Sequence, residues 1–482
     1  MFNGYRVLVL LISFLIPTLV LADEHAGHDH GKREECPVCG MWIDQYQRTA
    51  GEVVHKDGKI EHTCGVACLL RLVLDEGEDR FSSLKVTDWT DHKLVDARKA
   101  SYVIGSKVIP DMIPNVIAFE TREKAEAFQA KKGGEVISFA GALRVVGPRP
   151  FANPFRIQPA VTNAEGAFQT SIGVSYGTKD QVMLGSASRD PTGFIKGNNA
   201  QPRAPKSIQT FQQVYNVNYG ITDDLTLLAT MPFLEKRAVA LVRNPKTKQI
   251  NEVATDNNGP GDLNLRWRYN LWRSVEYDKW FTLYLGMTLP TGYFDPRYLA
   301  SPGLQLGKGT ATFEPGLLYS QRIQNFWINT SATYLVNPVN QHYKYGDQAI
   351  LGLGIHYTPS YSNMIGVQFD AFFAQKNECT NQKVCVAGQQ SLGAPVLGRK
   401  IGNTGGNSLN INFVGDWRFL NALGGNFVLR ANVGLPLYQD LNDKKTIGPA
   451  GQYTQAQLGG GWYGSLSISY ATRFVEGLDI GE

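Results

Sequence analysis

The sequence predicts a mixed fold, in which a small α+β domain is followed by an all-β antiparallel transmembrane barrel of about twelve strands. Its 482 residues are too many for one ordinary compact domain. Four of the six cysteines and six of the eight histidines lie before Asp96, which confines metal-type chemistry to the N-terminal quarter. From residue 166 onward, apolar and polar residues alternate with a period of two, as in strands that separate lipid from water.

The chain begins with a predicted secretory signal over residues 1–22. Arg6 supplies its positive charge, residues 7–21 its apolar core and Ala22 a small residue for cleavage. The apolar run, at about 15 residues, is shorter than the ~20 of a membrane-spanning helix, although an uncleaved anchor is the alternative. We therefore expect an exported chain whose thiols meet an oxidising compartment and need a metal or a disulfide. Residues 23–35 are expected to form a flexible polar tail whose histidines could gather metal loosely: His25, His28 and His30.

Residues 36–143 are predicted to form a compact α+β domain. Its expected elements, in order, are strands at 48–54 and 59–63, a helix at 64–74, a hairpin over 87–89 and 94–96, a helix at 121–131 and a strand at 135–139. Thr121 can cap the second helix, and Gly133 ends it. The domain thus contains two similar halves, each a hairpin followed by a helix.

Soft sulfur ligands are concentrated in two short stretches of this domain. Cys36 and Cys39 are separated by two residues, and Cys64 and Cys68 by three, at spacings typical of metal sites. The first pair lies on an entering loop and the second opens a helix, so four sulfurs can close on one metal. Met41 adds a thioether, and this ligand set suits Cu(I) and Zn(II).

Three interpretations of these sulfurs compete, and a fourth is disfavoured. The three are a Cu(I) site that includes thioethers, a structural Zn(II) site of four thiolates, and disulfides without metal. A redox thiol enzyme is disfavoured because Gly40 and its polar context do not match a thioredoxin-type turn from strand to helix. No acid–base pair or nucleophile constellation stands out, so we do not expect an enzyme.

Several separate segments of the domain occur in the order found in one known family. They are Cys39-Gly-Met41, His62-Thr-Cys64-Gly-Val-Ala-Cys68, Ser101–Lys107, Asp111-Met112, Ile117–Phe119 and Ala125–Phe128. Over residues 34–143 they resemble NosL proteins, which are periplasmic copper-binding accessory proteins, some of them serving copper-site assembly in nitrous oxide reductase. The resemblance implies that Cys39, Met41 and Met112 hold copper and that a periplasmic copper protein is a partner.

Two departures from that family bear on the site. NosL proteins are usually lipid-anchored through a cysteine at their N-terminus, and this signal has no such cysteine. Cys36, Cys64 and Cys68 also supply more thiols than the family motif needs. These three cysteines, together with His62, are expected to complete or support the metal site.

Residues 166–482 are predicted to form the barrel. Trp267 faces one way, while Arg266 and Arg268 face the other way and must meet water. Short and long connections between strands alternate, which places residue 166 and the N-terminal domain on the periplasmic side of the outer membrane. The expected strands are 166–178, 208–219, 224–235, 261–273, 279–291, 310–322, 326–337, 347–359, 363–376, 407–419, 425–437 and 459–471.

A soluble β-sandwich or propeller is the alternative for this part of the chain. Long strands, strongly polar second faces, and tyrosines and tryptophans near strand ends favour a membrane barrel. A linker rich in proline and turn residues, 144–165, precedes it. Cys379 and Cys385 fall in one long external loop, where we expect a disulfide.

Short segments of the barrel also occur in a familiar order. They are Gly220–Leu227, Gly261-Asp-Leu263, Leu289–Gly292, Gly346-Asp-Gln348 and Leu435–Asp440. Over residues 155–470 they resemble an outer-membrane family named for phenol-degradation pathways. Members of that family are proposed channels whose substrates are mostly unassigned, so the resemblance implies architecture more than function.

Together these features predict an outer-membrane protein whose periplasmic domain binds a soft metal, Cu(I) before Zn(II), for copper handling or efflux coupled to the barrel. One alternative is an outer-membrane channel for small organic molecules, with an N-terminal domain stapled by zinc or disulfides. Another is an assembly protein that docks a periplasmic partner. The inward arginines suit anions or polar solutes better than a bare cation: Arg266, Arg268, Arg418 and Arg430.

The expected partners follow from the same features. They are the lipid of the outer membrane, a metal ion and a periplasmic copper protein. The formal net charge of +4 argues against a nucleic-acid binder, which would be far more basic. The sequence gives no prediction of the oligomeric state.

Overall fold

The structure is a computed structural model that describes residues 33–147, 157–196, 203–295, 302–340, 343–379, 404–448 and 451–474. The predicted signal, the tail histidines His25, His28 and His30, and Cys385 lie outside these residues, so the predictions made for them stay predictions. No helix within the described ranges is long and apolar enough to cross a membrane.

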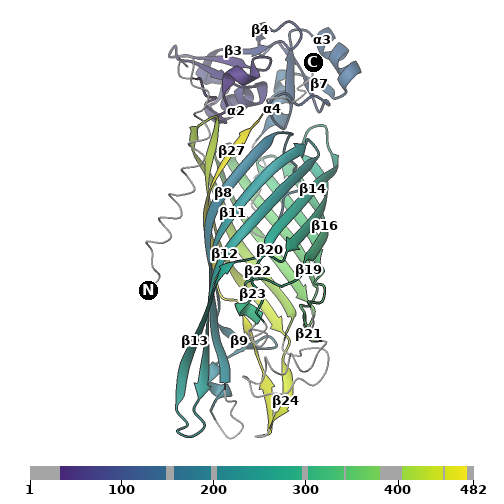
Figure 1. The fold of residues 1–482 in the computed structure, drawn as a ribbon. Helices are drawn as coiled ribbons and strands as arrows, with labels where there is room; N and C mark the ends of the chain where they lie inside the picture. The colour runs from purple at the N-terminus through teal and green to yellow at the C-terminus, as the bar shows by residue number, and fades with distance from the viewer. Residues whose placement is uncertain are drawn as a thin grey trace, which may run out of the picture. The chain divides into compact units, whose positions relative to one another are not determined.

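The N-terminal domain, as far as the structure describes it, combines two small antiparallel sheets with three α-helices (purple to blue in Figure 1). The first sheet has the order β2-β1-β3-β4 and consists of β1 (Gly51–His55), β2 (Ile60–Thr63), β3 (Phe81–Thr87) and β4 (Leu94–Asp96). The second has the order β6-β5-β7 and consists of β5 (Ser101–Ile104), β6 (Val116–Phe119) and β7 (Glu135–Ile137). The helices are α2 (Val66–Glu76), α3 (Arg122–Lys132) and α4 (Phe139–Val146), with 3₁₀ turns η1 (Ile43–Tyr46) and η2 (Glu78–Arg80).

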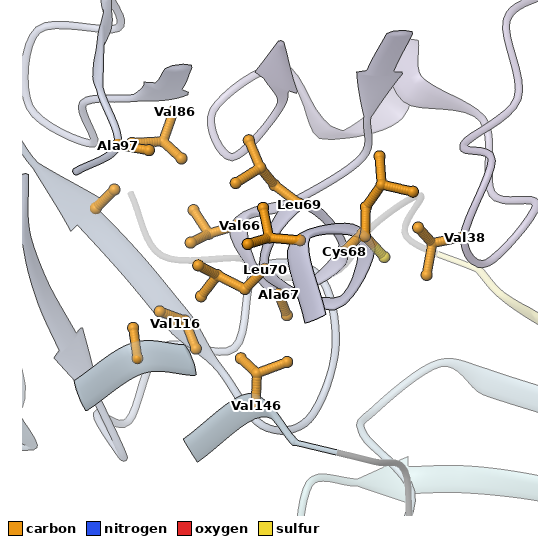
Figure 2. Close-up of a cluster of buried hydrophobic side chains, with 14 of the residues drawn as sticks. Val38, Val66, Ala67, Cys68, Leu69, Leu70, Val86, Ala97, Val116 and Val146 are labelled. Atoms are coloured by element: carbon orange, nitrogen blue, oxygen red, sulfur yellow. The ribbon is translucent and has the colours of Figure 1, made fainter. Parts of the chain in front are cut away.

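Helix α2 forms the centre of the domain core because most of its surface is apolar. Leu69 and Leu70 are fully buried. Figure 2 shows them among Val86 from β3, Val116 from β6 and Val146 from α4. Burial of each such side chain contributes about 1.5–3 kcal/mol, so α2 joins both sheets into one core.

Helix α4 occupies residues that the sequence predicted as the end of a strand and the start of a linker. The Ser138 side chain caps this helix by accepting a hydrogen bond from the Gly141 amide at 3.4 Å. Phe139 and Val145 are buried in the same core as α2. The prediction was wrong because it extended the strand through the capping residue, and burial of the apolar helix face decides the conformation.

Among the described residues, twelve antiparallel strands form a closed ring. In ring order they are β8 (Ala167–Lys179), β11 (Arg203–Thr222), β12 (Leu225–Arg243), β14 (Leu263–Arg273), β15 (Lys279–Leu289), β16 (Thr312–Ile323), β17 (Phe326–Leu335), β19 (Gln348–Ser360), β20 (Asn363–Ala374), β22 (Gly406–Ala422), β23 (Gly425–Leu441) and β27 (Tyr463–Arg473). The seam pairs β27 with β8, where Ile468 lies opposite Ile172. The predicted fold class is confirmed, and each of the twelve expected strands is present within a few residues.

The two faces of the barrel wall have opposite chemistry. Outward side chains such as Leu285, Ile355 and Leu437 are large, apolar and exposed. Inward polar side chains such as Thr282 and Asn412 are fully buried. A closed ring leaves no unpaired strand edge, so a wall of this kind can lie in hydrocarbon. The chain therefore contains an outer-membrane barrel, as the sequence predicts.

One hairpin extends beyond the ring, where the sequence predicted a loop over 236–260. β12 continues to Arg243, and β13 (Ile250–Pro260) pairs along it. Most of β13 is exposed and polar on both faces, so it lacks the alternation that marks a membrane strand. The other short elements are β9 (Gln181–Leu184), β10 (Ala187–Arg189), β18 (Tyr343–Lys344), β21 (Glu378–Cys379), β24 (Lys444–Gly448), β25 (Gly451–Gln455), β26 (Gln457–Gly459), η3 (Pro191–Phe194) and η5 (Pro302–Leu304).

Residues 157–165, named the strap here, lie inside the barrel. The Ala160 amide donates a hydrogen bond to Ser320 Oγ at 2.8 Å. Arg268 Nη1 donates to the Val161 carbonyl at 3.0 Å. Both side chains belong to the inward face of the wall, so this part of the predicted linker is a component of the lumen.

The N-terminal domain contacts the end of the barrel that carries the short turns. Tyr277, between β14 and β15, donates from its hydroxyl to Asn115 Oδ1 at 2.6 Å. Arg322, near the end of β16, donates to the Val145 and Val146 carbonyls at 2.9 and 3.2 Å. This places a cation at the C-terminus of α4, where the helix dipole favours it. Short turns face the periplasm in outer-membrane barrels, so the domain lies on the periplasmic side, as predicted.

Closure at the β8–β27 seam gives a testable prediction. Ile468→Pro removes an amide donor and clashes in a strand that is paired on both sides, so the ring should fail to close. We expect this variant to lose the heat-dependent change in gel mobility that the wild-type protein shows in detergent. Ile468→Val is the control and should keep it. A closed, heat-modifiable Ile468→Pro protein would contradict the seam.

Candidate metal centre

Four cysteine sulfurs meet in the N-terminal domain. The Sγ atoms of Cys36, Cys39, Cys64 and Cys68, named the sulfur cluster here, all lie within 4.8 Å of one another. The Cys39 and Cys64 sulfurs are 3.3 Å apart, and those of Cys64 and Cys68 are 3.8 Å apart. All four side chains are buried, with Cys39 the most exposed at 3%. The structure thus brings together the two pairs that the sequence singled out.

Local backbone geometry explains why these cysteines converge. Cys36 and Cys39 lie in a tight turn closed by the Gly40 amide, which donates to the Cys36 carbonyl at 2.8 Å. Gly40 has φ +79°, a conformation that glycine adopts most easily. Cys64 follows β2 directly, and Cys68 lies in the first turn of α2. The short connection between β2 and α2 therefore keeps these two cysteines close together.

The spacing of the sulfurs fits a bound metal. A disulfide requires an S–S distance of about 2.05 Å, so the cysteines at these separations are free thiols. A tetrahedral metal with M–S bonds of about 2.3 Å needs sulfurs about 3.8 Å apart, which is close to the distances found. The cluster can therefore close on one soft ion with small shifts of the side chains.

The protonation of the cluster is uneven. Burial raises the pKa of the Cys36 thiol, but hydrogen bonds from the other three cysteines outweigh it and hold that pKa well below the usual value. The hydrogen bond with Cys36 raises the pKa of Cys64, and burial raises the pKa of Cys68. Because the pKa values of Cys64 and Cys68 are raised, a metal that binds these thiols as thiolates must displace protons.

One candidate thioether, that of Met112, lies at the edge of the cluster. Met112 Sδ is 3.9 Å from Cys68 Sγ and 2.6 Å from Arg71 Nη1. Met41 Sδ accepts a hydrogen bond from the Tyr46 hydroxyl at 3.2 Å. Both methionines, with Cys39, line a cavity of about 160 Å³. The cluster is therefore open to ligand exchange on its thioether side.

His62 does not join the cluster. It lies on β2 next to Thr63, and because strand side chains alternate, the buried Thr63 and His62 point to opposite faces. The His62 side chain is 41% exposed, and its Nε2 is 3.8 Å from Glu52 Oε2. The structure therefore brings together the four cysteines and Met112, places Met41 in the wall of the adjoining cavity and leaves His62 partly exposed on β2.

Sequence reasoning missed two buried charged residues beside the cluster. Arg71 lies three residues after Cys68 on α2, which puts both on one helix face, and this spacing could have identified it. Asp111 precedes Met112 and is fully buried, and burial raises the pKa of its carboxyl to about 6. The backbone amide of Met112 donates to Asp111 Oδ1 at 2.7 Å, so Asp111 orients a candidate ligand.

The barrel holds the first cysteine loop in place. Arg418 Nη1 donates to the Val38 carbonyl at 2.7 Å, and Asn426 Nδ2 donates to the Cys39 carbonyl at 3.2 Å. A Cβ on Gly40 would lie 1.9 Å from the Gly425 carbonyl oxygen, so only glycine fits. The inward arginines were interpreted from the sequence as a lining for polar solutes, but Arg418 binds the cysteine loop.

Arg268 was likewise expected to line the lumen for polar solutes, but it binds the strap. Its guanidinium donates to backbone carbonyls in the lumen and is almost fully buried. Alternation along a strand identifies which residues face inward, but it does not reveal which of them other segments of the chain cover.

The N-terminal domain and the barrel are similar to two different protein families. The NosL family model matches residues 28–142, and the family model for the "MetA-pathway of phenol degradation" matches residues 190–391. Both resemblances predicted from the sequence are thereby confirmed.

A curated relative and two solved structures are similar to parts of this chain. The copper-binding lipoprotein NosL of Stutzerimonas stutzeri is 31% identical over 124 residues, which is 24% of this chain, and the chain spans 63% of that relative's length. The copper chaperone NosL from Shewanella denitrificans is 27% identical with a TM-score of 0.22, covering 24% of this chain and 92% of that chain. An outer membrane channel from Pseudomonas putida F1 is 13% identical with a TM-score of 0.43, covering 68% of this chain and 100% of that chain.

The docking of the cysteine loop gives a second testable prediction. Gly40→Ala costs roughly 1–2 kcal/mol in backbone strain and also clashes with the barrel turn at Gly425. The loop should move away from the turn and expose its thiols, so we expect maleimide to label reduced, metal-free protein about tenfold faster than wild type, equivalent to roughly 1.4 kcal/mol.

Gly58→Ala is the matched control. Gly58 also has a positive φ, of +91°, but a Cβ there meets nothing within 4 Å. The Gly58→Ala protein should label at the wild-type rate. A Gly40→Ala protein that also labels at the wild-type rate would show that contact with the barrel turn does not control access to the thiols.

Proposed function

We propose that this protein binds Cu(I) through the sulfur cluster of its N-terminal domain and handles copper at the periplasmic face of the outer membrane, coupled to its barrel. The observation that carries the proposal is the meeting of four thiols within 4.8 Å, with the Met112 thioether 3.9 Å from Cys68 Sγ and Met41 in the wall of the adjoining cavity. Cu(I) prefers soft thiolate and thioether donors over oxygen. The similarity to copper-binding NosL proteins supports copper as the ion.

The proposed ligands divide into two groups. Cys39, Met41 and Met112 lie where the cluster meets the cavity, which suits a site that receives and releases an ion. Cys36, Cys64 and Cys68 lie deeper and complete or support the site, since Cu(I) binds only two to four of these sulfurs at a time.

Zinc is the second candidate for the same thiols. Sulfur separations of 3.3 and 3.8 Å approach the edge of a tetrahedral four-thiolate site. In that case the domain would be a stapled cover on a channel for small organic molecules, and the strap inside the lumen is consistent with such a cover. Thioethers bind Zn(II) poorly, so the contribution of the methionines distinguishes the two proposals.

Titration of the full-length protein tests the proposal. The reduced protein is purified in detergent without oxygen, and Cu(I) is titrated against a competing chelator. Met41→Ala and Met112→Ala should each weaken Cu(I) binding about tenfold, or roughly 1.4 kcal/mol. Cys39→Ser should weaken it more, because it removes a thiolate.

Met231→Ala is the control, since Met231 lies on β12 of the barrel, outside the cavity. It should leave the affinity unchanged. Loss of Cu(I) binding with the cysteine variants but not with the methionine variants, together with displacement of Cu(I) by Zn(II), would favour the zinc-stapled cover.

A further inference from the structure

The cavity beside the sulfur cluster is rich in positive charge. It has a volume of about 160 Å³ and lies between the N-terminal domain, the strap and the inner wall of the barrel. Among the described residues that line it, the charged side chains are five guanidinium groups and one carboxylate, that of Asp111. The guanidinium groups are those of Arg71, Arg268, Arg322, Arg430 and Arg473.

Most of these guanidinium groups bind neutral acceptors. Arg473 donates to the Ile109 and Asp111 carbonyls at 3.1 and 2.5 Å, and Arg322 and Arg268 likewise donate to backbone carbonyls. A carbonyl oxygen satisfies an N–H group but carries no net charge to cancel the cation. Arg430 differs, because its Nε lies 3.2 Å from Asp416 Oδ2.

Arg71 offers the cavity a buried N–H group that no acceptor among the described residues satisfies. Its side chain is 2% exposed, and within the described part of the chain its Nε has no hydrogen-bond partner. Its Nη1 lies against Met112 Sδ, and its guanidinium lies over the Tyr361 ring at 4.7 Å. Neither of these partners is charged. Asp111, Cys39 and Cys68 lie near enough to act on the guanidinium electrostatically, but none of them hydrogen-bonds its Nε. A buried N–H group without a partner is costly. Arg71 also connects the cavity to a candidate copper ligand.

We propose that this cavity binds a small anion, and that the anion is a Cu(I) thiolate complex from which the sulfur cluster takes its metal. The inference rests on the proposed function and names the form in which copper arrives. A bare cuprous cation is repelled by the guanidinium groups, whereas a complex of one Cu(I) with two anionic thiolates carries net negative charge. Buried guanidinium groups favour such an anion, because their N–H groups form charge-assisted hydrogen bonds with it.

The transfer is a ligand exchange without redox change. Bonds from copper to the two carrier sulfurs break, and bonds to cysteine sulfurs form. Copper stays Cu(I), and the protons of the cysteine thiols pass to the departing carrier thiolates. Arg71 holds the anion beside Met112 and Cys39, where copper is exchanged. The volume limits the carrier to a small thiolate, since a water molecule occupies about 30 Å³.

Two carriers of similar size and opposite charge test the inference. Cu(I) is supplied without oxygen to the full-length protein either as its 3-mercaptopropionate complex, which is anionic, or as its cysteamine complex, which is cationic. The copper–sulfur chemistry is the same in both. Wild-type protein should load from the anionic complex about tenfold faster at low salt, and the difference should shrink as salt screens the charges.

Variants then assign the preference to the cavity. Arg71→Gln and Arg430→Gln should each bring the ratio of the two loading rates towards one, while Arg71→Lys should retain much of the preference because it keeps the charge. Arg266→Gln is the matched control: Arg266 lies on β14 two residues before Arg268 but does not line the cavity. It should load as wild type does.

The outcomes separate this inference from the proposed function. Wild-type protein that loads equally from both carriers, or faster from cysteamine, overturns the anion site even when its equilibrium Cu(I) affinity is high. Loss of preference in Arg266→Gln as well as in Arg71→Gln assigns the effect to overall charge and also overturns it. Absence of Cu(I) binding at equilibrium refutes the proposed function instead. Heat-modifiable mobility and equilibrium Cu(I) affinity verify that each variant is folded, and Arg430→Gln provides a second test if Arg71→Gln is not.

Discussion

The arrangement of the candidate metal site depends on one contact, the docking of the first cysteine loop against the turn between β22 and β23. Arg418 and Asn426 bind carbonyls of that loop, and Gly40 lies so close to Gly425 that no side chain fits between them. These contacts set where Cys36 and Cys39 face the second cysteine pair on β2 and α2. The barrel is therefore a structural part of the candidate metal site as well as the membrane-spanning part of the chain.

The same contacts show that some of the barrel's inward arginines bind other segments of the chain. A pore lined with guanidinium groups repels a bare cation. From the sequence alone, this charge conflicts with the prediction that the barrel is coupled to copper handling. In the structure, Arg268 and Arg418 bind backbone carbonyls of the strap and of the cysteine loop, so they join two parts of one chain. Arg71, by contrast, contacts Met112 beside the sulfur cluster and lines the cavity together with Arg268, and this positive charge is the basis for proposing that the metal arrives in an anionic form.

The sequence predicts the barrel well because lipid imposes a simple pattern on each strand. Period-two alternation over long segments predicted all twelve strands of the ring. The spacing of the two cysteine pairs predicted that their four sulfurs lie close together.

Where lipid imposes no pattern, the predictions were less successful. β13 is polar on both faces and was expected as a loop, and Ser138 ends one element and caps the next, so α4 was missed. His62 was included through its proximity to Cys64 in sequence, but strand alternation turns it to the surface. Contacts such as that between Arg418 and Val38 join residues far apart in the chain, and no local pattern encodes them.

X-ray absorption spectroscopy of the full-length protein, loaded with one equivalent of Cu(I), tests the central claim most directly, because it reports the atoms bound to copper. The account predicts a first shell made of sulfur, without imidazole scattering, that changes in Cys39→Ser and is unaltered in a His62→Ala variant. A first shell of nitrogen and oxygen, or a spectrum that responds to His62→Ala but not to Cys39→Ser, would contradict it.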